Sequence, residues 1–174
     1  MASNIRDILF SVKSLLGGTA AFMMGNSLLG VILPLRMEGA GYPVALTGAI
    51  MAAYYLGLAL GGWRGKHVIF RIGHIRAFAV FAAITASATL AYSLFFHPAA
   101  WLVLRIVNGF CIAGMTATIE SWLNMRSSNE TRGRVLGFYM LTFYLAVAAG
   151  QSMVNLAEVG SGDLFMYAAA LIGL

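Results

Sequence analysis

Charged side chains are scarce in this sequence. They make up 10% of its 174 residues, whereas hydrophobic residues make up 60%, and the mean hydropathy is +0.84. Soluble domains usually carry about 25% charged residues. A surface so poor in charge would aggregate in water, so the composition excludes an ordinary soluble domain and favours lipid as the solvent.

Cysteine is nearly absent as well. Cys111 is the only one and falls inside an apolar stretch, so the chain has no disulfide framework and no paired-cysteine metal site. The histidines, His67, His74 and His97, are not arranged as metal ligands, and no set of nucleophile, base and orienting residue is visible. We therefore expect neither an enzyme nor a bound metal or other cofactor.

Long apolar stretches are the main feature of the sequence. A helix that crosses the hydrocarbon core of a membrane needs about 20 apolar residues. Five stretches reach this length, at about 10–35, 44–63, 75–96, 99–124 and 135–157, and a sixth begins near Leu164. The pattern predicts an all-α integral membrane protein in which residues 1–174 form one six-helix bundle. Because the sixth stretch has only eleven residues, we expect the chain to be a fragment whose last helix is incomplete.

Basic residues are divided unequally between the two ends of these predicted helices. Short connections such as His97-Pro98 make neighbouring helices antiparallel, which leaves Arg36 on one side and nine basic residues on the other. Basic loops stay in the cytoplasm, so we predict a cytoplasmic N-terminus. Basic clusters between apolar stretches do not form a face for nucleic acid. The nine are Arg6, Lys13, Arg64, Lys66, Arg71, Arg76, Arg126, Arg132 and Arg134.

Two ionisable residues inside the fourth predicted span are candidates for function. Arg105 and Glu120 lie about 22 Å apart on nearly the same face of the helix. Each costs about 2.5–3.5 kcal/mol at the centre of a membrane. The alternatives are interfacial: Arg105 could reach the outer headgroups, and Glu120 could pair with Arg126 or Arg132.

Uncharged polar residues lie in other spans. Asn26 is in the first, Tyr54 and Tyr55 are in the second, Asn108 is one turn from Arg105, and Tyr139 and Gln151 are in the fifth. A single polar residue more often bonds a neighbouring helix than a ligand. Together they predict a polar cavity bounded by the first, second, fourth and fifth spans, with the apolar third span facing lipid on most sides.

Pairs of glycines four residues apart predict close packing of helices. Gly57 and Gly61 form one pair in the second span, and Gly133 and Gly137 form another at the start of the fifth. Glycine at this spacing lets two backbones approach each other in a membrane.

Three motifs carry a resemblance to a known family. In the stretch 61–76 between the second and third spans, Arg71, Gly73 and Arg76 follow a glycine-and-arginine loop motif, although Phe70 replaces its Asp and Lys66 its first Gly. The run 105–109 matches an R-x-x-x-G motif whose arginine is associated with proton coupling. With these motifs the chain resembles, over its whole length, the N-terminal half of a major facilitator superfamily transporter. The segments 120–124 and 129–134 are similar to its bacterial YcaD-like branch.

The resemblance implies a secondary active transporter of the bacterial inner membrane that moves a small solute by alternating access. Its partners would be the lipid bilayer, the solute, and a second six-helix half or a second subunit. Arg105 would hold an anionic group or modulate a proton site, with Glu120 on the same pathway, and hydrogen bonds to the solute would come from Asn26, Asn108, Tyr139 and Gln151. The alternative is a non-transporting accessory subunit of a larger membrane complex. An ion channel has no support, because no charged ring or filter-like loop is visible.

Overall fold

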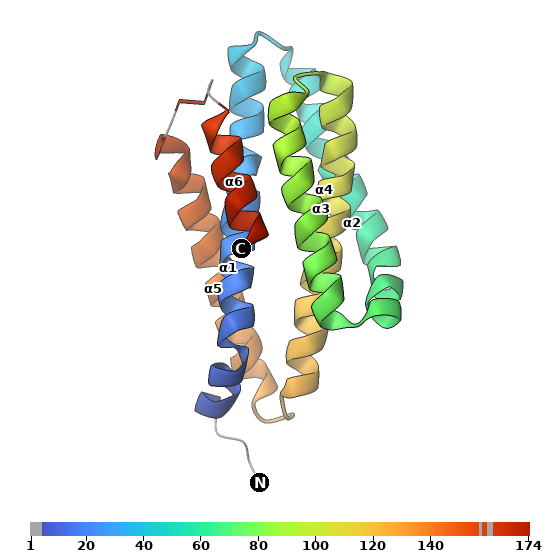
Figure 1. Cartoon of the computed structure of the whole chain (residues 1–174), viewed down its shortest axis with the longest axis vertical. Coiled ribbons are helices and arrows are strands. Elements are labelled where there is room, and N and C mark those ends of the chain that lie inside the picture. Colours follow the sequence, from blue (N-terminus) through green and yellow to red (C-terminus); the bar gives the residue numbers. More distant parts are fainter. Residues whose placement is uncertain (1–4, 157, 160–161) are drawn as a thin grey trace.

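The protein is a bundle of antiparallel helices (Figure 1). This computed structural model describes residues 5–156, 158–159 and 162–174, and for residues 5–12 it describes the backbone alone. The described residues contain no strand. The elements in chain order are α1 (Ile5–Gly39), α2 (Val44–Ile72), α3 (His74–Leu94), α4 (Pro98–Arg126), α5 (Arg132–Ser152), the 3-10 helix η1 (Met153–Leu156) and α6 (Asp163–Gly173).

Five of these helices are long and apolar enough to cross a membrane, as the sequence predicts. The sixth, α6, has 11 residues. The second helix is longer than predicted and continues from Trp63 to Ile72, because the basic residues that end its apolar pattern are still compatible with a helix. The predicted end of the fifth span, Ala157, lies outside the described residues.

Local sequence explains where the helices break. Gly73 separates α2 from α3 with a φ of 80°, a value that side chains rarely adopt, and its N–H bonds the carbonyl of Ile69. At the start of α4, the His97 side chain accepts a hydrogen bond from the N–H of Ala99 at 3.3 Å. Pro98 follows as the first helical residue, where its missing N–H costs nothing.

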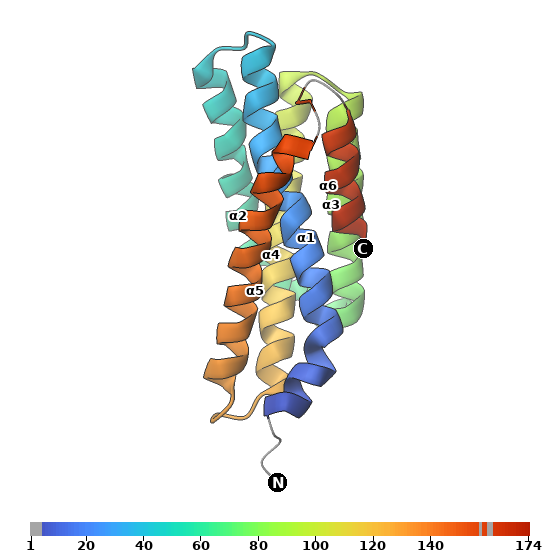
Figure 2. The same ribbon diagram turned by 90° about the vertical axis from the view of Figure 1, so that its left-hand side faces the viewer.

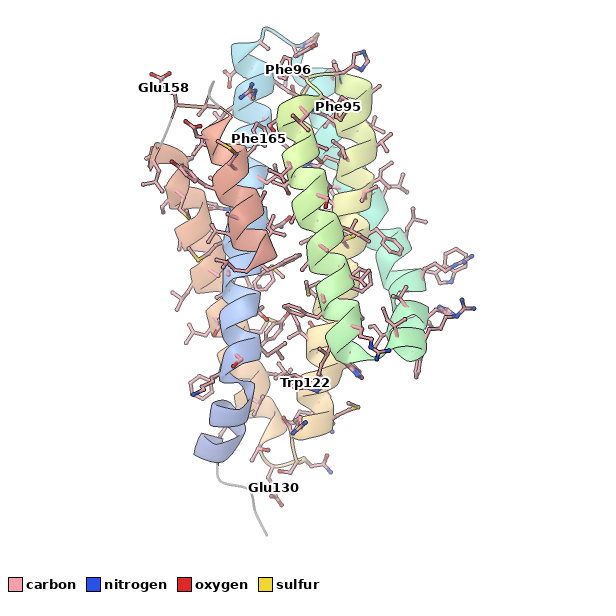
Figure 3. The ribbon with its side chains drawn as sticks, in the orientation of Figure 1. Phe95, Phe96, Trp122, Glu130, Glu158 and Phe165 are labelled. Carbon is pink, nitrogen blue, oxygen red and sulfur yellow. The ribbon has the colours of Figure 1, made fainter. Side chains whose placement is uncertain are left out.

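The helices alternate in direction, so the connections divide between two ends of the bundle. The N-terminus, the α2–α3 turn and the α4–α5 turn lie at the lower end of Figure 1, and the other connections lie at the upper end. Figure 3 labels side chains of both ends: Trp122 and Glu130 lie towards the lower end, and Phe96 and Phe165 towards the upper end. The division of the basic residues between two sides, made from the sequence, assumes this same alternation of helix direction.

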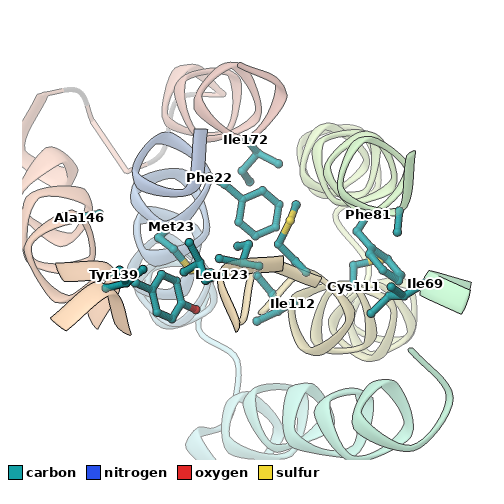
Figure 4. Packing of buried hydrophobic residues seen from close by; sticks show 14 residues of the cluster. Phe22, Met23, Ile69, Phe81, Cys111, Ile112, Leu123, Tyr139, Ala146 and Ile172 are labelled. Carbon is teal, nitrogen blue, oxygen red and sulfur yellow. The ribbon is translucent and has the colours of Figure 1, made fainter. Parts of the chain in front are cut away.

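The packing of the helices repeats itself. The most extensive contacts are α2 with α4, α1 with α5, α3 with α4, α1 with α6, and α3 with α6. If α1 is exchanged with α4, α2 with α5 and α3 with α6, the same set of contacts results. Because α1 and α4 begin at opposite ends of the bundle, the two triplets are related as inverted repeats, a construction typical of transporters. Figure 2 shows α1 and α5 side by side, and Figure 4 shows α2 on the side opposite α3 and α6.

The third helix is more buried than the sequence predicts. It packs against α4 and α6 with a side that includes Phe81, Thr85 and Tyr92, while Val80 and Ile84 on its other side are exposed. The prediction that it faces lipid on most sides is therefore correct for one side of the helix and wrong for the other.

One of the two predicted glycine pairs mediates close packing. Side chains at Gly57 and Gly61 would collide with the backbone of α4, so the prediction for this pair is confirmed. At positions 133 and 137 a side chain would meet none of the described atoms, so within this bundle the prediction for Gly133 and Gly137 is wrong. Glycine spacing identifies helices that can approach each other, but it does not show which of them have a partner on that side.

Candidate functional site

A layer of polar side chains separates two apolar parts of the core. One apolar cluster includes Met23, Cys111 and Tyr139, some of which Figure 4 shows from close by, and the other includes Leu28, Trp101 and Phe165. In α1 and in α4, the residues of one cluster are succeeded by those of the other at the same level of the bundle. At this level lie Asn26 from α1, Tyr54 from α2, and Arg105 and Asn108 from α4. Together with Tyr92 from α3, whose ring belongs to the second cluster, we call these residues the polar layer.

Arg105 is the charged member of the polar layer and is only 3% exposed. It begins the third turn of α4, about 10 Å from the N-terminal end of that helix. Its Nη2 donates to the sulfur of Met51 at 3.1 Å, and its guanidinium carbon lies 5.3 Å from the centre of the Tyr54 ring. The side chain therefore packs against α2 inside the bundle and does not extend out of it.

The Arg105 side chain is incompletely paired. Its Nε is buried and has no hydrogen-bond partner among the described residues. A thioether is a weak acceptor, so the bond to Met51 is a poor substitute for a bond to an anion. A guanidinium has five donors in a planar fork, and of these the Nε donor has no acceptor among the described residues and Nη2 has only a thioether.

Asn108 and Tyr92 lie side by side next to Arg105. Both side chains are fully buried. The Tyr92 hydroxyl and the Asn108 amide lie within reach of each other, but in the described part of the chain no hydrogen bond of ordinary length and angle reaches the hydroxyl or either atom of the amide. Buried groups of this kind are nearly always paired, so these orphaned donors and acceptors single out the polar layer as a site for a bound species.

On the α1 side, the polar layer continues with Asn26, which lies beside Tyr54. The Oδ1 of Asn26 is buried and accepts no hydrogen bond from any described group. The next residue, Ser27, donates its hydroxyl to the carbonyl of Val147 in α5 at 2.9 Å. This bond holds α1 against α5 and fixes the height of Asn26 in the bundle.

The other candidates from the fourth and fifth spans lie elsewhere. Glu120 is half-buried in the lower part of α4, where it lies close to Tyr139, a fully buried member of the apolar cluster. Gln151 is exposed near the upper end of α5. The structure therefore brings together three of the six predicted pathway residues, Asn26, Arg105 and Asn108, while Glu120 and Tyr139 form a separate pair. A pathway role for the other three stays a prediction.

The loop-motif residues surround the turn between α2 and α3. Arg71 and Arg76 are exposed on either side of Gly73. Beside them His74 shares a hydrogen bond of 3.0 Å with the hydroxyl of Ser121, which ties the start of α3 to α4. The motif thus forms part of the lower end of the bundle, away from the polar layer.

Sequence reasoning missed two residues of the site. Tyr92 belongs to the span expected to be apolar, and Met51 has no polar pattern to mark it. Tyr54 is one of the polar residues that predict the cavity, and its ring lies beside the Arg105 guanidinium. It lies three residues before Gly57, on the helix face that the glycine pair commits to close packing.

Comparisons with known proteins agree with this architecture. A family model described as Major Facilitator Superfamily matches residues 15–174. The MFS-type transporter YcaD of Salmonella arizonae is 26% identical over 144 residues, which cover 83% of this chain and 38% of that protein. The YcaD protein of Escherichia fergusonii is 25% identical over 161 residues, covering 92% of this chain and 42% of that protein. The chain thus spans about two fifths of the length of these relatives.

No solved structure matches the chain. The family model nevertheless covers nearly all of it, and the helices, their antiparallel order and their repeated packing are those of a multi-pass membrane protein. The chain belongs to the major facilitator superfamily.

Proposed function

We propose that the full-length protein is a secondary transporter that moves a small solute across the bacterial inner membrane by alternating access. The observation that carries this proposal is the polar layer, because it places a guanidinium and two amides with unpaired atoms inside a membrane bundle. Ionisable groups within membranes are costly, and they commonly mark solute or ion pathways. Simple helix packing requires none of them. Membership of a transporter family supports the same conclusion.

A second body completes the transporter in this proposal. Alternating access requires two halves that rock against each other around a central site. Large side chains are exposed on α2 and α5, among them Tyr55, Trp63 and Tyr144. We propose that a second six-helix half or a second subunit covers this side of the bundle, and that the solute binds between the two bodies.

Uptake into proteoliposomes tests the proposal. We expect vesicles containing the purified full-length protein to accumulate at least one compound from a bacterial metabolite extract, detected by mass spectrometry of the vesicle contents. Vesicles without protein, incubated in the same extract, are the control. Equal contents in both kinds of vesicle, with and without an imposed pH gradient, would contradict a transport function.

The orientation in the membrane is also part of the proposal. The basic side chains Arg64, Arg71, Arg76 and Arg126 are exposed towards the lower end of the bundle, which also holds the N-terminus. Basic residues are enriched on the cytoplasmic side of membrane proteins. We therefore propose that the lower end of Figure 1 faces the cytoplasm.

Reporter fusions provide a direct check of this orientation. Fusions after Arg76 and after Met125 should report a cytoplasmic location, and fusions after Gly39 and after Pro98 a periplasmic one. Alkaline phosphatase and green fluorescent protein are suitable reporters because each is active on one side only. Any pair with reversed signals would be incompatible with the proposed orientation.

A further inference from the structure

Arg105 is a buried cation that has no carboxylate beside it among the described residues. Of the described side chains, Tyr92, Tyr54 and Tyr55 interact electrostatically with its guanidinium, and no carboxylate does. Tyrosine hydroxyls are uncharged near neutral pH. A buried charge is normally paired with an opposite charge, because the interior of a protein does not replace the hydration that the charge has lost.

The positions of the acidic residues explain the missing partner. The sequence has six aspartates and glutamates in total. Glu120 is on the same helix as Arg105 but about 22 Å further along it. The other five lie within the first turns, the last turns or the connections of the helices, and they are Asp7, Glu38, Glu130, Glu158 and Asp163. Among the described residues, the polar layer therefore has a net positive charge and contains no carboxylate.

We propose that the polar layer binds the charged group of a small oxyanion, a carboxylate or a phosphate, and that the transported solute belongs to this class. This inference rests on the proposed transport function and specifies its substrate. Arg105 supplies the planar pair of N–H donors that matches two oxygens of such a group. The orphaned Asn108 amide and Tyr92 hydroxyl beside it supply further donors.

Met51 occupies the place of the anion in this conformation. Its sulfur receives the Nη2 donor of Arg105 at 3.1 Å, and the Tyr54 ring covers the guanidinium. A methionine side chain is unbranched and flexible, so it can leave this position at little cost. An entering oxyanion replaces a weak thioether acceptor with a charged one.

Binding of defined anions to the full-length protein in detergent tests the proposal. The probes are sodium benzoate, sodium lactate, sodium succinate and sodium phosphate, with benzamide, lactamide and succinamide as neutral counterparts and sodium chloride as the control for ionic strength. We expect at least one anion to raise the Tm more than its neutral counterpart or sodium chloride does, and we expect Arg105→Gln to lose this shift. A panel without such a shift, or a shift that Arg105→Gln retains, would overturn the proposal.

A built-in anion provides a test that needs no ligand. Glutamate has nearly the length of methionine, so Met51→Glu places a carboxylate next to the guanidinium. We expect Met51→Glu to keep or raise the Tm of the otherwise unchanged protein and to remove the shift caused by added anions. In the Arg105→Gln background, where the new carboxylate has no partner, the same substitution should lower the Tm. An equal loss of Tm in both backgrounds would show that Arg105 does not need an anion.

The outcomes separate this inference from the proposed function. Anion binding that depends on Arg105, combined with no uptake of any compound into proteoliposomes, would support the anion site and contradict transport. Uptake of a neutral or cationic compound that survives Arg105→Gln would support transport and overturn the anion site.

Discussion

Replacing Arg105 with lysine abolishes or strongly impairs uptake by the full-length protein, while its expression and folding remain intact. Lysine keeps the positive charge, but its ammonium is a point charge and cannot present two parallel donors to one oxyanion. Hydrogen bonds to charged groups contribute about 1.5–3 kcal/mol, and a factor of ten corresponds to about 1.4 kcal/mol. Losing one such bond therefore lowers uptake by about ten- to a hundredfold.

Arg105→Gln should have at least as large an effect on uptake, because it removes the charge as well as the fork of donors. It should not lower the Tm, since it also removes a cation that is costly inside a membrane. The measurements are uptake of the identified solute into proteoliposomes and the size-exclusion profile of each variant. Arg126→Lys is the matched control, because Arg126 is exposed at the lower end of α4, where its guanidinium lies 5.5 Å from the Trp122 ring centre.

Two results would change the interpretation of Arg105. Uptake close to the wild-type level in Arg105→Lys would reduce this residue to a generic positive charge. Normal uptake in both Arg105→Lys and Arg105→Gln would remove it from the mechanism. Impaired uptake in Arg126→Lys to the same degree would show that any arginine replacement disturbs the bundle.

Much of the fold can be predicted from the sequence because the membrane restricts the possible structures. A segment in lipid must satisfy its backbone polar groups internally, so a long apolar stretch must form a helix. The positions of the first five helices and their alternating directions therefore follow from apolar length and short connections. Arg105 and Asn108 can be identified in the same way, since polar groups stand out in an apolar helix.

The composition of the polar layer could not be predicted, because it depends on which helices become neighbours. Tyr92 stands out as a polar residue in an apolar span, but the sequence does not show which way it faces, and only the packing of α3 against α4 places it next to Asn108. Met51 cannot be distinguished from other apolar residues in the sequence, and it contacts Arg105 only because α2 packs against α4. Conversely, Tyr139 has the pattern of a cavity residue but is buried in the apolar cluster beside Glu120.

The close approach of α2 and α4 is the packing feature on which the polar layer depends. A side chain at Gly57 would meet the backbone of Ile106, and a side chain at Gly109 would meet the backbone of Tyr54. Both contacts are with residues next to the site: Ile106 follows Arg105, and Tyr54 carries the ring that covers its guanidinium. The two glycines therefore set the distance between Arg105 and the α2 residues that surround it.

Gly57→Ala and Gly109→Ala should each destabilise the protein, although alanine normally favours a helix over glycine by about 1 kcal/mol. Overpacking costs about 1–3 kcal/mol, and the upper part of this range applies here because the colliding atoms belong to a backbone that cannot rotate away. We expect a net loss of about 2 kcal/mol for each variant. Gly62→Ala is the matched control, since a side chain at this position of α2 meets none of the described atoms and therefore leaves the contact between α2 and α4 unchanged.

Thermal unfolding of the purified full-length variants in detergent, followed by tryptophan fluorescence, measures these differences. The double variant should lose less than the sum of the single losses, because once one contact has pushed α2 away from α4 the second collision is already relieved. Gly109→Ala should also weaken solute binding, since it displaces Tyr54 from Arg105, whereas Gly62→Ala should not. If Gly57→Ala and Gly109→Ala are as stable as Gly62→Ala, then α2 and α4 do not approach as closely as described, and the contacts between Arg105, Met51 and Tyr54 lose their structural basis.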